Sequence, residues 1–269
     1  MGSSLQILFI PLDICRIIAE YVVAPSLLDW IYKDFHKIDN RSLSRNPAAI
    51  YLLEVNPDKI NWEHLSRNPA AIHLLEANLD KIYWYNLSGN PAEWAIRLLE
   101  VNPNKINWDR LSGNPAAIHL LEANFNKIHW GWLSMNPMAI HLIEANLNKI
   151  NWIYLSLNPA AIHLLKANPN KIDWCWLSEN PTAMHMLEAN PDKIYWPQLS
   201  ANPAAIHLIE KNLDKLNKFG WMNLSANPAA IHLLKANPHR ICWYNLSRNP
   251  AIFEINQREI TKLAHWLHK

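Results

Sequence analysis

The 269-residue sequence has only five glycines and three cysteines, and these scarcities exclude several classes of protein. Five glycines leave no glycine-rich phosphate loop, and no Ser/His/Asp or Cys/His set stands apart from the periodicity of the chain. Cys15, Cys175 and Cys242 are far apart and lack the CxxC spacing of a zinc or redox motif, which indicates reduced thiols. We therefore expect no enzyme, no metal site and no cofactor.

Charge of one sign and uninterrupted apolar runs are also missing. Lys+Arg number 25 and Asp+Glu number 23, a formal net charge of +2 that is too balanced to favour nucleic acid or an anionic membrane through bulk electrostatics. The apolar stretch 5–23 is interrupted by Pro11, Asp13, Arg16 and Glu20, so it predicts neither a membrane span nor a signal peptide. Half of the residues are hydrophobic, enough for a sizeable core. We expect a folded intracellular protein.

What the chain does contain is a tandem repeat. Asn-Pro recurs at intervals of 22 residues, with two longer intervals of 24 and 25. The asparagines are Asn46, Asn68, Asn90, Asn114, Asn136, Asn158, Asn180, Asn202, Asn227 and Asn249. The consensus N-P-A-A-I-H-L-L-E-A-N-P-D-K-I-N-W-x-x-L-S-x defines positions 1 to 22, and nine full copies span 46–248. Repeats of this length predict an all-α solenoid of short helix–helix (α/3₁₀) units.

Local signals divide each repeat into two helical elements. Asn at position 1 caps a helix and Pro at position 2 fits its first turn. Asn at position 11, often followed by Pro, ends this helix after about ten residues. Asn or Asp at position 16 opens a second, shorter element through Leu at position 20, either α or 3₁₀. The apolar residues at positions 5, 8, 15, 17 and 20 need neighbouring repeats to bury them.

The position-17 tryptophans are expected in the core between repeats, each indole N–H with a buried acceptor, rather than in a platform for stacked bases. They are Trp62, Trp84, Trp108, Trp130, Trp152, Trp174, Trp196, Trp221 and Trp243. Repeats stacked like packed helices, about 8–10 Å apart, predict a rod or superhelix on the order of 90–100 Å long.

The ends depart from the consensus, as terminal repeats commonly do. Residues 1–23 are expected to form an N-terminal capping helix, 24–45 a degenerate first repeat with Asn40 in place of Trp, and 249–269 a C-terminal cap. Insertions at Glu93-Trp94 and at 218–220 are expected to be loop excursions or kinks. Each adds an aromatic residue, either for a partner contact or for local packing.

Two polar ladders repeat with the frame. Position 6 is His in seven copies and position 9 is usually Glu, so His119 and Glu122, at i and i+3, raise the question of a metal. Equivalent histidines on successive helices are about 8–10 Å apart, too far for zinc ligands at about 2.0–2.3 Å. Lys166 and Lys235 also replace the Glu in two copies. We expect hydrogen bonds between repeats instead.

Position 14 is Lys in eight copies and Arg240 in the ninth. A row of cations can follow a phosphate backbone, so nucleic-acid binding is one alternative function. Cations just beyond a helix C-terminus also offset its dipole, and neighbouring acidic residues dilute the row, so we favour this second interpretation.

Positions 18, 19 and 22 vary while the frame stays fixed, as an exposed surface permits. Three consecutive repeats carry aromatic residues at position 19, flanked by apolar ones, and such patches mark protein interaction sites. The predicted partner-binding residues are Trp132, Tyr154, Trp176, Ile153, Met135 and Leu157. Partial burial of position 19 is the alternative, because this periodicity does not decide orientation.

The unit N-P-x-A-I-x-L-L-E-x-N-P-x-K-I-x-W-x-x-L-S, over about 46–252, resembles short tandem repeats of giant double-stranded DNA viruses that infect amoebae. The resemblance implies a multi-copy viral repeat protein that meets host or virion proteins, in the host cytoplasm or the virion. Residues 9–23 resemble the opening of an F-box, which implies binding to a ubiquitin-ligase adaptor. The residues that fit this opening are Pro11, Leu12, Ile14, Ile17, Ile18 and Tyr21. The segment is too short for a complete F-box, and a hydrophobic cap fits it equally well.

The sequence therefore predicts a non-enzymatic protein-binding scaffold, without a membrane and either monomeric or self-associated end to end. The alternatives are a substrate receptor of a ubiquitin ligase and nucleic-acid binding along the Lys ladder.

Overall fold

The structure is a computed structural model that describes residues 26–254, and it confirms an all-α repeat solenoid. A repeat contains more elements than expected. In the copy 46–67, a 3₁₀ turn (Pro47–Ala49) leads into α4 (Ile50–Glu54), and a second 3₁₀ turn (Pro57–Lys59) precedes α5 (Trp62–Leu65). The first predicted helix is thus a 3₁₀ turn joined to a short α-helix, and the second element is α rather than 3₁₀.

The caps explain these boundaries. Asn46 Oδ1 accepts from the amide of Ala48 at 3.0 Å, which starts the first 3₁₀ turn with Pro47 in its first position. Asn56 Nδ2 donates to the carbonyl of Leu52 at 2.9 Å and ends α4. Asn61 Oδ1 accepts from the amide of His64 at 3.0 Å, which starts α5. All three predicted asparagine signals are therefore present.

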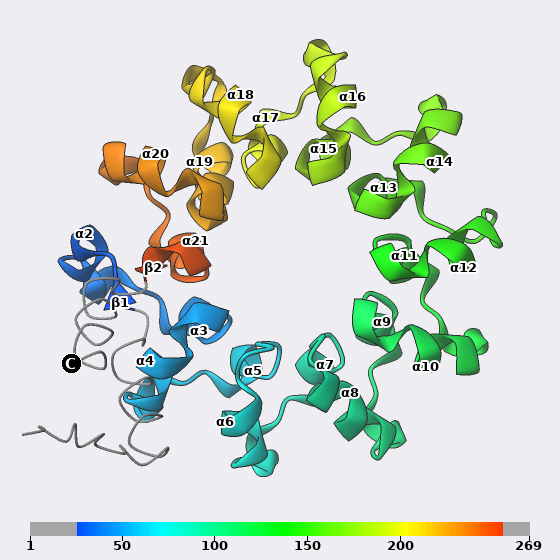
Figure 1. Cartoon of the computed structure of the whole chain (residues 1–269), viewed down its shortest axis with the longest axis horizontal. Coiled ribbons are helices and arrows are strands. Elements are labelled where there is room, and N and C mark those ends of the chain that lie inside the picture. The colour runs from blue at the N-terminus through cyan, green and yellow to red at the C-terminus, as the bar shows by residue number, and fades with distance from the viewer. Residues whose placement is uncertain (1–25, 255–269) are drawn as a thin grey trace, which may run out of the picture.

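The α-helices form two concentric layers (Figure 1). The inner layer comprises α3 (Asn40–Ser44), α5, α7 (Trp84–Leu87), α9 (Trp108–Ser112), α11 (Trp130–Ser134), α13 (Trp152–Leu157), α15 (Trp174–Glu179), α17 (Trp196–Leu199), α19 (Lys218–Ala226) and α21 (Trp243–Ser247). The outer layer comprises α2 (Asp29–Tyr32), α4, α6 (Ile72–Glu76), α8 (Glu93–Glu100), α10 (Ile118–Ala123), α12 (Ile140–Glu144), α14 (Ile162–Ala167), α16 (Met184–Glu188), α18 (Ile206–Glu210) and α20 (Ile231–Ala236).

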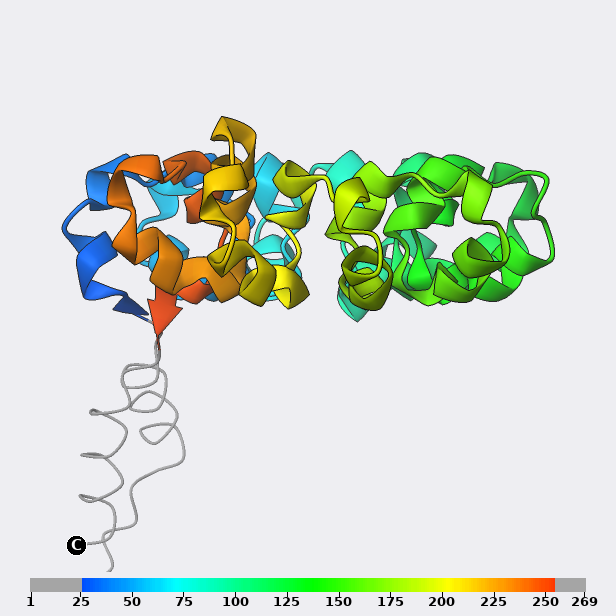
Figure 2. The same ribbon diagram turned by 90° about the horizontal axis from the view of Figure 1, so that it is seen from above.

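The solenoid closes on itself into a flat ring, so the predicted elongated rod or superhelix is wrong (Figures 1 and 2). Strand β1 (Ser26–Leu27) pairs with β2 (Phe253–Glu254) in an antiparallel ladder. Helix α21 packs against α3 in the same way as consecutive inner helices pack elsewhere. Nine full repeats and the degenerate first one complete a single turn. We call the junction between repeat 227–248 and residues 26–45 the seam.

The asparagines of position 1 form a buried ladder that runs around the whole ring. Asn158 Nδ2 donates to the carbonyls of Ser134 at 2.9 Å and Asn136 at 3.1 Å, which are two residues apart where repeat 114–135 joins repeat 136–157. Across the seam, Asn46 Nδ2 donates to the carbonyls of Ser247 at 3.1 Å and Asn249 at 2.9 Å. Each side chain thus caps its own repeat with its oxygen and binds the preceding repeat with its nitrogen.

The core is a continuous band between the two layers. Position 8 and position 20 are buried as expected, for example Leu121 and Leu133, but the third fully buried position is the small Ala at position 4, such as Ala117. Ile at position 5 and most tryptophans at position 17 are half-buried and pack against this band. Trp221 is the buried exception, and its Nε1 has no hydrogen-bond partner. The expected buried acceptors of the indole N–H groups do not occur within residues 26–254.

Both insertions lengthen helices instead of forming loops, which corrects the prediction. The first makes α8 eight residues long and the second makes α19 nine residues long. Trp94 packs against the core, whereas Phe219 is 65% exposed. The first extra aromatic residue therefore serves local packing and only the second is free for a partner. Residues 249–254 of the predicted C-terminal cap 249–269 complete the seam, and the rest of that cap lies outside the described residues, as does the predicted N-terminal cap 1–23.

Candidate functional site: the ring opening

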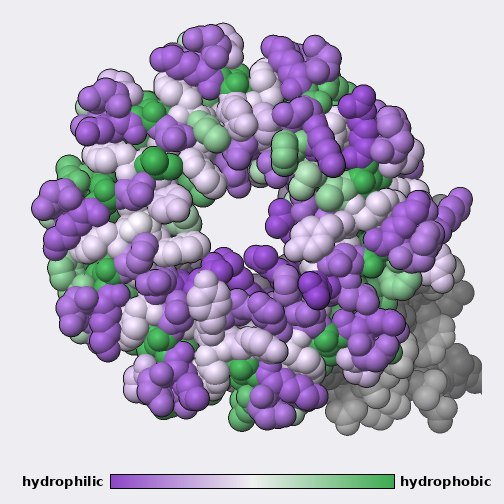
Figure 3. Space-filling view, turned by 180° about the vertical axis from the view of Figure 1, so that it is seen from behind, coloured by the Kyte–Doolittle hydropathy of each residue, from purple (hydrophilic) through white to green (hydrophobic). Residues whose placement is uncertain are grey.

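An opening passes through the middle of the ring and is bordered by the inner helices (Figure 3). Its rim next to α3 and α5, at the bottom of this view, is hydrophilic, whereas the rim next to α11 and α13 is paler and partly hydrophobic. The variable positions 18, 19 and 22 belong to these helices and their C-terminal ends. The positions that sequence variation singled out therefore lie around one shared opening.

Arginines gather on one side of the opening. Arg248, Arg45 and Arg67 occupy position 22 after α21, α3 and α5, which are consecutive inner helices across the seam, and Arg110 lies in α9. Burial lowers the pKa of Arg45, and the charges of Arg248 and Arg110 lower it further. Because Arg45 and Arg110 are three repeats apart on the ring, their charges act on each other across the opening.

This arginine cluster (Arg45, Arg67, Arg110 and Arg248) has no ion pair or guanidinium hydrogen bond with another residue in 26–254. Arg110 Nε is buried without a hydrogen-bond partner. Burial lowers the pKa of Arg67, and the charges of Arg45 and Arg110 lower it further. Half-buried cations that repel one another and lack carboxylate partners favour an external anion.

The predicted partner-binding residues lie on the other part of the rim. Trp132, Tyr154 and Trp176 come from the consecutive helices α11, α13 and α15 and are half-buried, so position 19 has the partial burial of the alternative interpretation. Tyr154 and Trp176 meet edge to face with their centroids 6.3 Å apart. Ile153 is 48% exposed, and Met135 and Leu157 occupy position 22, the same position as three of the arginines. The structure thus brings the predicted stripe together along α11 to α15.

Arg110 connects the two parts of the rim. Its guanidinium lies over the rings of Tyr85 at 4.6 Å and Trp132 at 5.0 Å, so both aromatic faces hold a cation. A Cβ on Gly113 would lie 3.5 Å from the Trp132 ring, an ordinary van der Waals distance, so the indole packs against the end of the preceding repeat. The cationic and aromatic sectors are therefore continuous.

Two more titratable groups belong to the rim. Glu179 follows the aromatic sector at position 22, and burial raises its pKa while the charge of Arg248 opposes that rise. Burial lowers the pKa of His64, with Arg45 acting in the same direction, and His64 Nδ1 is buried without a partner. The lowered pKa keeps this imidazole neutral at pH 7, so it adds no charge to the arginine cluster.

On the outer surface, the His ladder makes the hydrogen bonds between repeats that the sequence predicts. His141 Nε2 lies 2.8 Å from Glu122 Oε1 of the preceding repeat. The other pairs are His73–Glu54, His119–Glu100, His163–Glu144, His207–Glu188 and His232–Glu210. His185 lacks such a pair because Lys166 replaces the glutamate. No group of three potential metal ligands occurs among the described residues.

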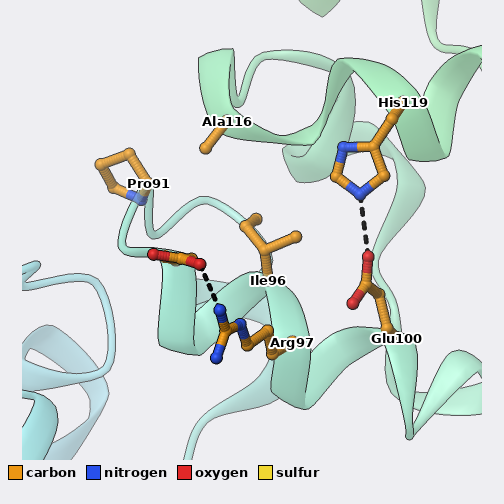
Figure 4. Close-up of a pocket in the computed structure, with 7 residues that line it drawn as sticks. Pro91, Ile96, Arg97, Glu100, Ala116 and His119 are labelled. Carbon is orange, nitrogen blue, oxygen red and sulfur yellow. Dashed lines mark hydrogen bonds and ion pairs between the residues drawn. The ribbon is translucent and has the colours of Figure 1, made fainter.

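A shallow pocket on the outer surface shows the same pairing (Figure 4). It is lined by His119, which pairs with Glu100 at 2.8 Å, and by Arg97, which pairs with Glu93 at 2.5 Å. Its charged groups therefore already have partners, and the pocket is a weaker candidate site than the ring opening.

Most cations of the Lys ladder lie over tryptophans. Lys127 Nζ lies 4.5 Å from the ring centroid of Trp108, a position-17 residue in the preceding repeat. The other pairs are Lys37–Trp243, Lys81–Trp62, Lys149–Trp130, Lys193–Trp174, Lys215–Trp196 and Arg240–Trp221. These cations thus join neighbouring repeats through cation–π contacts, a role that the helix-dipole interpretation missed.

Sequence reasoning also missed the arginine cluster. Its signal was Arg at position 22 in Arg45, Arg67 and Arg248, that is, in the first two repeats and the last. These repeats are neighbours only when the chain closes. The predicted adaptor-binding residues Pro11, Leu12, Ile14, Ile17, Ile18 and Tyr21 lie outside the described residues.

No family model, curated protein or solved structure matches the chain. Within residues 26–254, a helix with the length and apolar character of a membrane span does not occur. What supports a function is therefore the chemistry of the opening.

Proposed function

We propose that the protein is a non-enzymatic binding ring that holds an extended, acidic segment of a protein partner in its opening. The observation that carries this proposal is the continuous rim formed by the arginine cluster and the stripe Trp132, Tyr154 and Trp176. The aromatic sector offers apolar contact area, and Trp and Tyr are frequent hot-spot residues. The unpaired arginines offer charge complementarity to carboxylates.

The electrostatics of the opening favour a segment over a folded domain. The charge of Arg110 lowers the pKa of Arg45 although the two residues are three repeats apart, so the rim is narrow enough for charges on different repeats to interact. An extended chain carries its side chains on a thin backbone and fits such a space. The resemblance of the repeat makes a host or virion protein the expected source of the segment.

Protein is favoured over nucleic acid by the state of the aromatic rings. Arg110 lies over Trp132, and Tyr154 and Trp176 contact each other, so these rings do not present a row of free faces for bases. The Lys ladder, the other possible nucleic-acid surface, is largely engaged with tryptophans.

The test uses peptides displayed from a random 12-residue library and selected on the full-length ring. We expect acidic and apolar residues to be enriched, and fluorescence polarisation to show at least about a tenfold loss of affinity in Trp132→Ala/Tyr154→Ala/Trp176→Ala. The matched control is Tyr32→Ala/Tyr83→Ala/Tyr195→Ala, which removes three exposed aromatic residues elsewhere. Equal affinity of both folded triple variants, or selection without acidic residues, would refute the proposal.

A further inference from the structure

The arginine cluster differs from the other cations because the two ends of the chain build it together. Arg248 belongs to the last full repeat and Arg45 to the degenerate first one, so the two lie on opposite sides of the seam. Arg67 and Arg110 complete the cluster from the next repeats. An open solenoid would separate Arg248 from Arg45 by the whole length of the array.

The cluster works against closure as long as it is empty. Arg248 lowers the pKa of Arg45, which means that the two charges repel each other across the seam. The described residues provide no carboxylate in contact with any of the four guanidinium groups to offset this repulsion. Among the four, only Arg110 lies over aromatic rings, whereas most cations of the Lys ladder lie over tryptophans and Arg97 pairs with Glu93.

We propose that the arginine cluster binds a phosphate-bearing anion, and that the bound anion locks the ring at its seam. Guanidinium groups bind phosphate oxygens through paired, charge-assisted hydrogen bonds, and several arginines suit a multiply charged phosphate better than a single carboxylate. One anion between Arg45 and Arg248 would replace their repulsion by attraction to a common partner. Closure and binding are then linked, because only the closed ring holds the complete site.

Two sources carry this chemistry: a free polyphosphate, and a phosphorylated side chain in a partner segment. Only the second rests on the proposed function. The probes are therefore inorganic tripolyphosphate and a phosphoserine peptide, with the same peptide unphosphorylated as a control. A failure of the aromatic triple variant in peptide binding would leave the tripolyphosphate result unaffected, so the two proposals fail separately.

The decisive measurement is hydrogen exchange at the seam with and without tripolyphosphate. The amide of Leu28 donates to the carbonyl of Ile252 at 2.9 Å, and the amide of Asp39 donates to Ser247 Oγ at 2.9 Å, both across the seam. The amide of Asp173 makes the equivalent bond to Ser156 Oγ at 3.0 Å inside the array. We expect stronger added protection at Leu28 and Asp39 than at Asp173.

The variant Arg45→Gln/Arg248→Gln should bind tripolyphosphate about a hundredfold more weakly, because two charge-assisted contacts are lost. Lys166→Gln/Lys235→Gln removes the same charge from exposed positions on α14 and α20 and should bind like the wild type. If only the phosphoserine peptide adds protection at the seam, the arginine cluster is still the phosphate site, and the phosphate comes from a phosphorylated partner segment.

Three results would overturn the inference. They are binding that survives Arg45→Gln/Arg248→Gln, binding without added protection at the seam, and no binding of either phosphate probe. If a twelve-nucleotide oligothymidylate binds more tightly than both phosphate probes and protects the same amides, the inference is replaced by nucleic-acid binding.

Discussion

The seam and an internal repeat boundary are almost the same interface, although only the internal boundary is bridged by the chain. At the internal boundary, Asn158 binds two carbonyls of the preceding repeats, and at the seam Asn46 does the same. Lys127 lies over Trp108 and, across the seam, Lys37 lies over Trp243. Within residues 26–254, the first repeat therefore keeps at the seam the contacts that join the other repeats.

The differences lie in what each junction adds. Trp243 supplies the position-17 tryptophan at the seam, and Asn40, which replaces this tryptophan in the first repeat, belongs to the boundary with the following repeat. What the seam adds is the strand pair β1–β2. The first repeat therefore departs from the consensus at Asn40, but it keeps the residues that contact the last repeat, such as Lys37 and Asp39.

A covalent link across the seam should have the largest effect. Ser26 and Glu254 are directly paired and exposed, and paired strand residues have Cα atoms about 5.5 Å apart, which suits a disulfide. Ser26→Cys/Glu254→Cys should stabilise the oxidised ring by about 4–5 kcal/mol, because the closed loop is very long. Thermal unfolding of the oxidised and reduced forms measures this gain. Identical melting temperatures would mean that the seam does not limit stability.

Substitutions in the asparagine ladder can distinguish the stability of the fold from the closure of the ring. Asn46→Ala and Asn158→Ala should each cost about 3 kcal/mol, because a helical cap is lost and buried carbonyls lose their donor. Only Asn46→Ala should also open the ring, since no peptide bonds bridge the seam. Small-angle X-ray scattering should then show a larger radius of gyration for Asn46→Ala alone. Equal scattering from both variants would contradict an interface held mainly by this ladder.

The serines of position 21 offer a finer comparison. Ser247 Oγ accepts a hydrogen bond from the amide of Asp39 at the seam, and Ser178 Oγ accepts one from the amide of Tyr195 at an internal boundary. Ser200 accepts no such amide among the described residues, because the insertion at 218–220 shifts the next repeat. Ser247→Ala and Ser178→Ala should each cost about 1–3 kcal/mol and Ser200→Ala less, as urea denaturation can measure. A cost for Ser200→Ala as large as the other two would exclude this assignment.

The smallest effect concerns Glu179. Burial raises its pKa, so the folded ring binds this proton more readily than the unfolded chain does. Stability should therefore fall as pH rises from the ordinary value of 4.5 through the raised pKa. Because Arg248 lowers this pKa, Arg248→Gln should raise it further while Arg67→Gln leaves it unchanged. Carbon-detected NMR titration of the Glu179 carboxyl distinguishes the two.

Much of the local structure follows from single residues. Asn-Pro, the asparagine of position 11 and the cap at position 16 each predict a boundary that the structure contains, because a cap acts over one turn of its own helix. The second role of Asn46 and its equivalents, as donors to the preceding repeats, depends on which backbone carbonyls lie next to them. Ala at position 4 was likewise overlooked, because a small side chain gives no hydrophobic signal although the closest contacts require it.

Of the candidate site, the aromatic residues can be predicted from the sequence and the arginine cluster cannot. Trp132, Tyr154 and Trp176 occupy one position in consecutive repeats, so periodicity alone places them side by side. Arg45 and Arg248 are at opposite ends of the sequence, and nothing in the spacing brings them together. The seam, and with it the arginine cluster, requires knowledge of the whole turn.

The sequence by itself determined the repeat, its caps and the layer of residues that vary, because these depend on contacts within one repeat or between neighbours. Only the tertiary structure decided that ten repeats close into a ring around an opening. The rotation between neighbours follows from how the small Ala, the Leu residues and the Trp at position 17 pack. A slight change in that rotation, multiplied around the array, separates a closed ring from an open superhelix.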